Sequence, residues 1–232
     1  MKKFIKLKVL IGLLIINNHC LICQTLKKDS FSLTTLDKLK LSGVLATISQ
    51  YKGVNSIKIE LEPQNNGGDA ASFAKLSNIA FKDGIIKVNL VGKLGPNAPD
   101  WARGFVGIAF RIKDDNSKFE CIYLRPTNAQ SDDPVRRNRS IQYISYPDYK
   151  FDRLRTESPG KYESYANIVP GEWIKIKIEV KGTTAKLYVN DSSQPALTVK
   201  DLKHGADLNG SIGLWVDKGT EAYFSNLEII YY

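Results

Sequence analysis

Cysteine and histidine are scarce in this chain, which holds three cysteines and two histidines among its 232 residues. Cys20, Cys23 and His19 lie in an N-terminal stretch that we expect to be removed on export, which leaves Cys121 and His204. A single cysteine forms no internal disulfide, and Cys121 lies among apolar residues of an expected strand, as is typical of a small buried hydrophobe. Catalysis by a cysteine or a histidine is therefore not expected.

Long hydrophobic runs are also missing. The apolar run at residues 9–16 is too short to anchor the chain across a bilayer, and it follows several lysines. This order is typical of a signal peptide, so we expect residues 1–24 to be an export signal cleaved near Cys23 or Gln24. A lipid anchor on Cys23 is the alternative, although Ile22 is bulky for that kind of site. We therefore expect the protein to be secreted, periplasmic or at the cell surface of a bacterium.

The excess of positive charge is modest. The net charge is +9 at pH 7, and four lysines without any acidic residue in residues 1–24 leave +5 for the rest of the chain. Such a value gives little support for a nucleic-acid or membrane partner. The sequence also contains no phosphate-binding glycine loop, zinc-ligand cluster or recognisable catalytic triad.

Apolar and polar residues alternate with the period of two that is typical of strands. The alternation is most regular after Glu172, where Ile174, Ile176 and Ile178 share one face. We find no amphipathic helix of ten residues and no internal repeat. Short strands separated by turn residues predict an all-β fold, a sandwich of two antiparallel sheets. We expect strands at residues 44–51, 56–61, 84–91, 104–112, 119–126, 140–146, 172–180, 185–190, 211–216 and 222–229.

One long polar excursion, residues 128–167, is rich in arginine and tyrosine. An unstructured run of this length is unusual in a compact domain, so we expect it to pack over one sheet. In the two strands before it, alternation places residues such as Ile108 and Ile122 in the core. The opposite face would then carry Arg111, Cys121, Tyr123, Arg125 and, from a later strand, Trp215.

Four C-terminal segments resemble the laminin-G-like members of the concanavalin A-like lectin/glucanase superfamily: GEWIKIKI (171–178), LYVN (187–190), GLWV (213–216) and GTEAYFSNL (219–227). More narrowly, the chain resembles bacterial secreted proteins related to the 3-keto-disaccharide hydrolase-like domain. The resemblance covers roughly residues 40–232, and residues 25–39 are expected to form a polar lead-in. It implies a jelly roll whose concave face often holds sugar, although this sandwich hosts several functions.

A carbohydrate ligand would find suitable groups on that face. Aromatic rings stack on the C–H surfaces of sugars, and arginine or aspartate side chains bind hydroxyl groups. Alternatively, Arg111 and Arg125 are solvated strand residues paired with acidic neighbours. We expect the groove to be formed by Arg111, Tyr123, Arg125, Gln142, Tyr149, Arg153 and Trp215.

Paired carboxylates for sugar hydrolysis are not evident. Glycoside hydrolysis uses two carboxylates about 5–10 Å apart, and the resemblance implies that they lie two or four residues apart on one strand. Glu60 and Glu62 come nearest to this pattern, but Pro63 ends their strand. The usual glucanase mechanism is therefore not expected, and Asp217 and Glu163 remain as scattered catalytic candidates.

Three functions stay open. The first is a secreted carbohydrate-binding jelly roll, and the second is a glycoside hydrolase or a 3-keto-disaccharide hydrolase-like enzyme. The third is a laminin-G-like protein-interaction module. No cofactor or metal is expected: residues 114–117 (DDNS) are typical of a tight turn, with a structural calcium site as the alternative. Neither the sugar nor the oligomeric state follows from the sequence.

Overall fold

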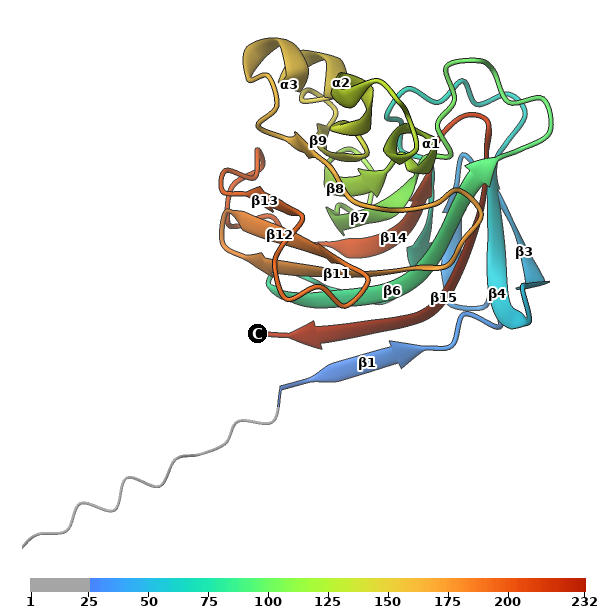
Figure 1. The fold of residues 1–232 in the computed structure, drawn as a ribbon. Helices are drawn as coiled ribbons and strands as arrows, with labels where there is room; N and C mark the ends of the chain where they lie inside the picture. The colour runs from blue at the N-terminus through green and yellow to red at the C-terminus, as the bar shows by residue number, and fades with distance from the viewer. Residues whose placement is uncertain (1–25) are drawn as a thin grey trace, which may run out of the picture.

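The computed structural model describes residues 26–232 and consists of two antiparallel sheets packed face to face (Figure 1). This confirms the predicted all-β, two-sheet sandwich. The expected export signal at residues 1–24, with the alternative lipid anchor at Cys23, lies outside the described residues. None of the helices formed by residues 26–232 is both long and apolar enough to cross a membrane.

The first sheet has eight strands. They are β1 Lys28–Phe31, β3 Val44–Tyr51, β4 Val54–Leu61, β6 Gly84–Leu94, β11 Ile174–Lys181, β12 Thr184–Val189, β13 Leu197–Val199 and β15 Thr220–Tyr231. Seven of them follow the order β13-β12-β11-β6-β15-β4-β3, and β1 pairs with β15 beside this path.

The second sheet has seven strands in the order β10-β9-β8-β7-β14-β5-β2. They are β2 Leu39–Ser42, β5 Phe73–Leu76, β7 Val106–Ile112, β8 Phe119–Leu124, β9 Ile141–Tyr146, β10 Glu163–Ser164 and β14 Ser211–Val216. Strand β9 confirms the strand predicted inside the polar excursion, since it pairs with β8 along its full length.

The segment expected to be a polar lead-in is part of the sandwich. Strand β1 lies within residues 25–39, and it pairs with the last strand, Lys28 opposite Ile230 and Phe31 opposite Leu227. Exposed and half-buried residues alternate along this strand, so its side chains are less buried than those of the central strands. The sandwich therefore starts near Lys28 and not at residue 40.

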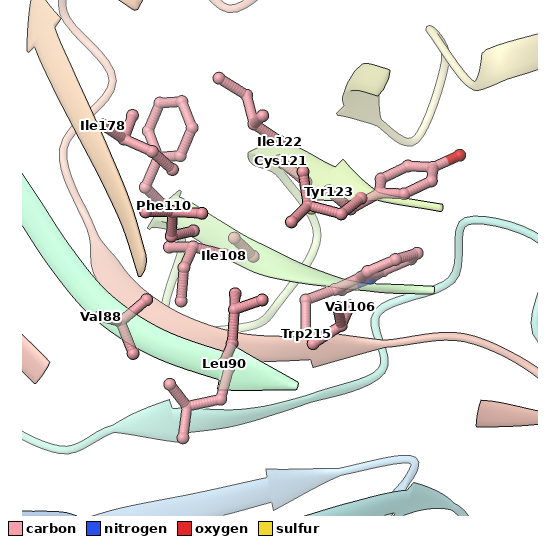
Figure 2. Packing of buried hydrophobic residues seen from close by; sticks show 14 of the residues in the cluster. Val88, Leu90, Val106, Ile108, Phe110, Cys121, Ile122, Tyr123, Ile178 and Trp215 are labelled. Atoms are coloured by element: carbon pink, nitrogen blue, oxygen red, sulfur yellow. The ribbon is translucent and has the colours of Figure 1, made fainter. Parts of the chain in front are cut away.

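The core lies between the two sheets and follows the predicted alternation. In β11, Ile176 and Ile178 are buried while Lys175 is exposed. Leu90 of the first sheet and Ile108 of the second are both fully buried, and Figure 2 shows them pointing into the space between the sheets. Burial of such side chains stabilises the fold by about 1.5–3 kcal/mol each relative to leaving them exposed.

Strands β7 and β8 are buried on both faces, although alternation predicted one open face. The loop at residues 62–72 returns over this second face. The Trp215 indole N–H donates a hydrogen bond to the Ala70 carbonyl (3.0 Å), and the Tyr123 hydroxyl donates one to Asp69 (3.0 Å). The expected shallow, open floor is therefore wrong, because a loop distant in sequence covers it.

Cys121 lies at the centre of β8 and is a free, fully buried cysteine. Burial raises the pKa of its thiol well above the ordinary value, and nearby carboxylates add to this effect. A thiol of this kind is a poor nucleophile, which confirms that Cys121 acts as a small core residue.

Three short helices structure the polar excursion. They are α1 Pro126–Ala129, α2 Pro134–Arg137 and α3 Phe151–Glu157. Asp133 caps α2, since its carboxylate accepts a hydrogen bond from the Val135 N–H (2.9 Å), and Leu154 anchors α3 in the core. Helices α2 and α3 lie on the side of the second sheet that faces away from the first, and α1 lies at the end of β8 (Figure 1). They bring a set of arginines to the end of β8.

Candidate functional site

A cavity of about 510 Å³ opens where the end of β8 meets the loop at residues 62–72 and the three helices. It is lined by Gly68, Asp69, Trp101, Arg103, Phe105, Tyr123, Arg125, Asn128, Asp133, Arg136, Arg139, Phe151, Arg155 and Asp217. A second hollow of about 410 Å³ lies over β6 and β11, but its charged side chains pair with one another, as Lys87 does with Glu228 and Lys175 with Asp191. The first cavity is the stronger candidate because it combines buried polar groups with aromatic surface.

Arg125 lies at the base of the cavity and is 5% exposed. It extends from the end of β8, and one of its terminal nitrogens donates a hydrogen bond to the Tyr123 hydroxyl oxygen (2.9 Å). The other donates to Glu163 of β10 (3.2 Å). A guanidinium held at both terminal nitrogens is fixed in orientation before any ligand arrives.

Glu163 gathers three arginines behind the cavity. Besides Arg125, it accepts hydrogen bonds from Arg155 and lies 3.6 Å from the Arg139 Nε. Burial alone would raise the pKa of Glu163, but the Arg155 hydrogen bond and the three positive charges hold it below the ordinary value. The Glu163 carboxylate therefore stays ionised and positions arginines, and the structure does not bring this catalytic candidate to the cavity lining.

Asp69 is a buried carboxyl group that binds the same Tyr123 hydroxyl as Arg125 does. It is 1% exposed, and it accepts hydrogen bonds from the Tyr123 hydroxyl (3.0 Å) and the Phe151 N–H (2.9 Å). Burial raises the pKa of Asp69 to about 6; the Asp217 charge adds to this and the Phe151 hydrogen bond opposes it. Arg125, Tyr123 and Asp69 thus form one continuous chain of hydrogen bonds along the cavity.

Asp217 follows β14 and holds the loop that carries Asp69. Its carboxylate accepts hydrogen bonds from the N–H groups of Gly68 (3.0 Å), Asp69 (3.0 Å) and Lys218 (2.7 Å). Gly67 has φ +71°, and a Cβ there would overlap this carboxylate, so a glycine is required at the approach. Burial raises the pKa of Asp217, and the backbone hydrogen bonds oppose that shift.

Aromatic rings form the remaining walls. Trp101 is 50% exposed at the mouth, and its ring centroid lies 6.3 Å from that of Phe105. Phe105 meets Tyr123 edge to face at 6.2 Å, and Tyr123 packs on Trp215 at 4.7 Å. Figure 2 shows the Tyr123 and Trp215 rings beside each other. The Phe151 ring lies 5.4 Å from the Arg125 guanidinium. The cavity therefore offers ring faces next to fixed polar groups.

The predicted groove residues fall into two groups. Tyr123 and Arg125 line the cavity, as does the catalytic candidate Asp217, and Trp215 supports Tyr123 from behind. Because Trp215 is fully buried with its N–H bonded to Ala70, it has no surface to offer a ligand.

Arg111, Gln142, Tyr149 and Arg153 lie outside the cavity. Gln142 is fully buried and donates hydrogen bonds to backbone carbonyls. Arg153 stacks over the Tyr149 ring, 4.1 Å from its centroid, and pairs with Glu157 within α3. The contacts of Gln142, Tyr149 and Arg153 stabilise the polar excursion itself. The prediction that these three residues contribute to the groove is therefore wrong.

Arg111 departs furthest from expectation. It has φ +54°, and the pairing of β7 with β14 shifts register there: Ser211 pairs with Ile112 and Gly213 with Ala109, so β7 holds one extra residue. Its fully buried guanidinium donates hydrogen bonds to the carbonyl oxygens of three loops and pairs with Asp83 (3.0 Å). Arg111 is therefore a structural clamp between loops, neither a ligand contact nor a solvated strand residue.

Several lining residues are missing from the sequence-based prediction. Asp69 follows two glycines in a segment that reads as a plain loop, and Trp101 and Arg103 follow a proline-rich break. Arg136 and Arg139 lie in a stretch that is charged throughout. The glycine pair before Asp69 is the one local sign that the backbone makes a close approach at this point.

The turn at residues 114–117 joins β7 to β8, which confirms the predicted tight turn. The oxygen atoms of this turn bind a lysine ammonium group. Lys75 Nζ donates hydrogen bonds to the Asp114 carbonyl (2.9 Å) and to the Asn116 Oδ1 (2.5 Å). Burial lowers the pKa of Lys75, partly offset by Asp114. Residues 26–232 contain no cluster of three or more side chains suited to a metal ion.

No protein-family model matches this chain, and no curated protein matches its sequence. Solved structures do match its fold. The carbohydrate-binding module CBM66 from Bacillus subtilis is 15% identical, with 82% of this chain and 97% of that module covered at a TM-score of 0.54. A Bacillus subtilis protein of unknown function with a galectin-like fold is 13% identical, with 89% and 98% covered at a TM-score of 0.54. Such low identities bear on the fold and not on activity. These likenesses show that the chain shares its two-sheet β-sandwich fold with these two proteins.

Proposed function

We propose that the protein binds a carbohydrate in the cavity around Arg125. The proposal is carried by one observation, the meeting of exposed aromatic surface and buried polar groups in a single cavity. Trp101 offers a ring at the mouth, while Asp69 offers acceptor oxygens and Arg125 offers donors. A sugar presents apolar C–H faces and hydroxyl groups together, so both kinds of contact match its chemistry.

The polar groups of the cavity are fixed in advance. Arg125 is held between Glu163 and Tyr123, and Asp69 is held between Tyr123 and the backbone of Phe151. Groups whose rotamers are already set lose little conformational entropy when a ligand binds. The fold shared with a protein described as a carbohydrate-binding module supports the same proposal by analogy.

A glycan array followed by calorimetry tests the proposal with Trp101→Ala and Asp69→Asn. Tyr165→Ala is the matched control, because Tyr165 is 42% exposed and lies outside the cavity, while Trp101 is 50% exposed. We expect Trp101→Ala to weaken glycan binding about threefold or more through lost stacking, and Tyr165→Ala to leave it unchanged. The proposal is wrong if no glycan binds, or if both cavity variants bind as tightly as the unaltered protein.

A glycoside hydrolase, or a 3-keto-disaccharide hydrolase-like enzyme, is the second candidate, and Asp69 favours it. An acid with a raised pKa beside a second carboxylate is the arrangement that supplies a general acid in sugar hydrolysis. Asp69 has such a pKa, and Asp217 lines the same cavity. In this case a bound glycan releases reducing sugar, and Asp69→Asn abolishes the release while binding persists. A protein that only binds releases none.

The same measurements separate the third candidate, a laminin-G-like protein-interaction module. A partner protein would then bind, and no glycan would compete with it for the Trp101 surface. Export from a bacterial cell belongs to our proposal as well, because a glycan outside the cytoplasm would otherwise be out of reach. Cell fractionation of the full chain in its host tests that part.

A further inference from the structure

The cavity holds more positive charge than its carboxylates neutralise. Five arginines line it, at positions 103, 125, 136, 139 and 155. Glu163 forms ion pairs with three of them, Arg125, Arg139 and Arg155. The three carboxylates in the lining have other partners: Asp133 caps α2, Asp217 accepts backbone N–H groups, and Asp69 accepts the Tyr123 hydroxyl and the Phe151 N–H. This leaves Arg103 and Arg136 as the charges to be explained.

Arg103 and Arg136 bind neutral partners. Arg103 donates from Nη1 to the carbonyl oxygens of Asp100 and Ala102, both at 2.6 Å, and Arg136 donates from Nε to the Asn128 Oδ1 (3.0 Å). Neither forms an ion pair with another residue in the range 26–232. Burial lowers the pKa of Arg103, and the charges of Arg136 and Arg125 lower it further, with only partial compensation by Asp100. Two like charges thus lie near each other, and neither has an ion-pair partner among the described residues.

Both guanidinium groups are oriented but not saturated. Asn128, which positions Arg136, is itself held by a hydrogen bond from its amide to the Arg139 carbonyl (3.1 Å). Within the described residues, each guanidinium uses one of its three nitrogens for protein hydrogen bonds. The remaining N–H groups suit a planar or tetrahedral anion with several oxygens, which arginine binds through paired hydrogen bonds.

We propose that the glycan bound in this cavity is anionic, with a uronate carboxylate or a sulfate ester held by Arg103 and Arg136. The inference rests on the proposed carbohydrate function and names the class of its ligand. The sugar ring then lies against the aromatic walls, where Asp69 accepts hydrogen bonds from its hydroxyl groups. The anion supplies the ion-pair partner that these two arginines do not find among residues 26–232, where only the charge of Asp100 partly compensates Arg103.

The test uses an array that holds neutral, uronate-containing and sulfated glycans, with calorimetry at physiological salt. Each charged glycan that binds is compared with its own neutralised form, methyl-esterified for a uronate and desulfated for a sulfate. Screening at this salt suppresses the long-range effect of net charge. We expect the neutralised form to bind at least about tenfold more weakly, the loss typical of a charge-assisted hydrogen bond. The arm that shows this loss identifies the anion.

Arg136→Ala and Arg137→Ala form a matched pair on α2. Both remove one positive charge, but Arg137 is exposed and does not line the cavity. We expect Arg136→Ala to weaken binding of the charged glycan about tenfold and Arg137→Ala to leave it unchanged. Equal losses in both variants would indicate non-specific attraction and overturn the inference. Binding of neutral glycans alone, or equal affinity for both forms, overturns it while the carbohydrate proposal stands. If no glycan binds at all, both proposals fail.

Discussion

The buried carboxyl of Asp69 makes stability depend on pH in a direction that can be worked out. Burial raises its pKa from 3.8 to about 6. Between these values the folded protein binds more protons at this site than the unfolded chain does, so this group's contribution to stability is greatest below pH 3.8 and is lost as the pH rises to about 6. A shift of about two pKa units corresponds to about 3 kcal/mol in the free energy of unfolding.

Asp69→Asn isolates this effect, because asparagine does not titrate. Urea denaturation of both proteins at pH 4 and pH 7.5 gives the difference in their free energies of unfolding at each pH. Other groups whose pKa values shift on folding, such as Glu163 and Asp201, are common to both proteins and cancel in the difference. We expect the variant to gain about 2.5 kcal/mol relative to the unaltered protein between the two pH values, slightly less than the full shift because the unfolded carboxyl group is already more than half ionised at pH 4.

The control is Asp207→Asn, which removes a carboxylate whose side chain is 98% exposed. The reasoning would be refuted if the difference in the free energy of unfolding between Asp69→Asn and the unaltered protein were the same at both pH values within about 0.5 kcal/mol, the scatter typical of surface substitutions. It would mean that water reaches Asp69 freely and that the loop over the second sheet does not close as described.

Three further outcomes follow from the packing. Trp215→Ala should lower the free energy of unfolding by about 3–5 kcal/mol, since it empties a fully buried site behind Tyr123; urea denaturation measures it. Arg111→Met should lower it by about 3 kcal/mol, because three carbonyl groups and Asp83 lose their partner, and it should leave glycan affinity unchanged in calorimetry. Gly67→Ala should cost about 1–3 kcal/mol through backbone strain and overlap with the Asp217 carboxylate, and weaken glycan binding because the same loop carries Asp69. Full stability of Gly67→Ala would contradict the close approach of that loop.

The strands could be predicted from the sequence because the burial of one face produces a local pattern of alternating apolar and polar residues in each strand. In β11 every second residue faces the core, so the isoleucines and lysines alternate and the pattern identifies the strand by itself. The same pattern identified β8, which carries Cys121 and Tyr123 and ends just before Arg125, but it assigned Cys121 to a face expected to be open that is buried. It misplaced Arg111, because the extra residue in β7 opposite β14 and the positive φ of Arg111 turn that side chain toward loops that alternation does not describe.

The conformations of the loops that complete the cavity could not be predicted in the same way. Asp69 reaches the site because Asp217 binds the backbone of its loop, and these two residues are 148 positions apart. The contact between Tyr123 and Asp69 spans 54 positions. Neither loop carries a periodic pattern, since its conformation is set by hydrogen bonds to distant partners and not by a repeating buried face.

The sequence by itself determined the all-β sandwich and most of its strands, because alternation of apolar and polar residues records which face of each strand meets the core. The burial of Cys121 was indicated by its apolar neighbours and not by the alternation. The tertiary structure decided the lining of the cavity that we propose as the binding site. It covered the expected open face with residues 62–72, moved Arg111 into a loop clamp and gathered Asp69, Trp101, Arg103 and Arg136 around Arg125. These outcomes depend on long-range hydrogen bonds and on charges brought together only when the chain has folded.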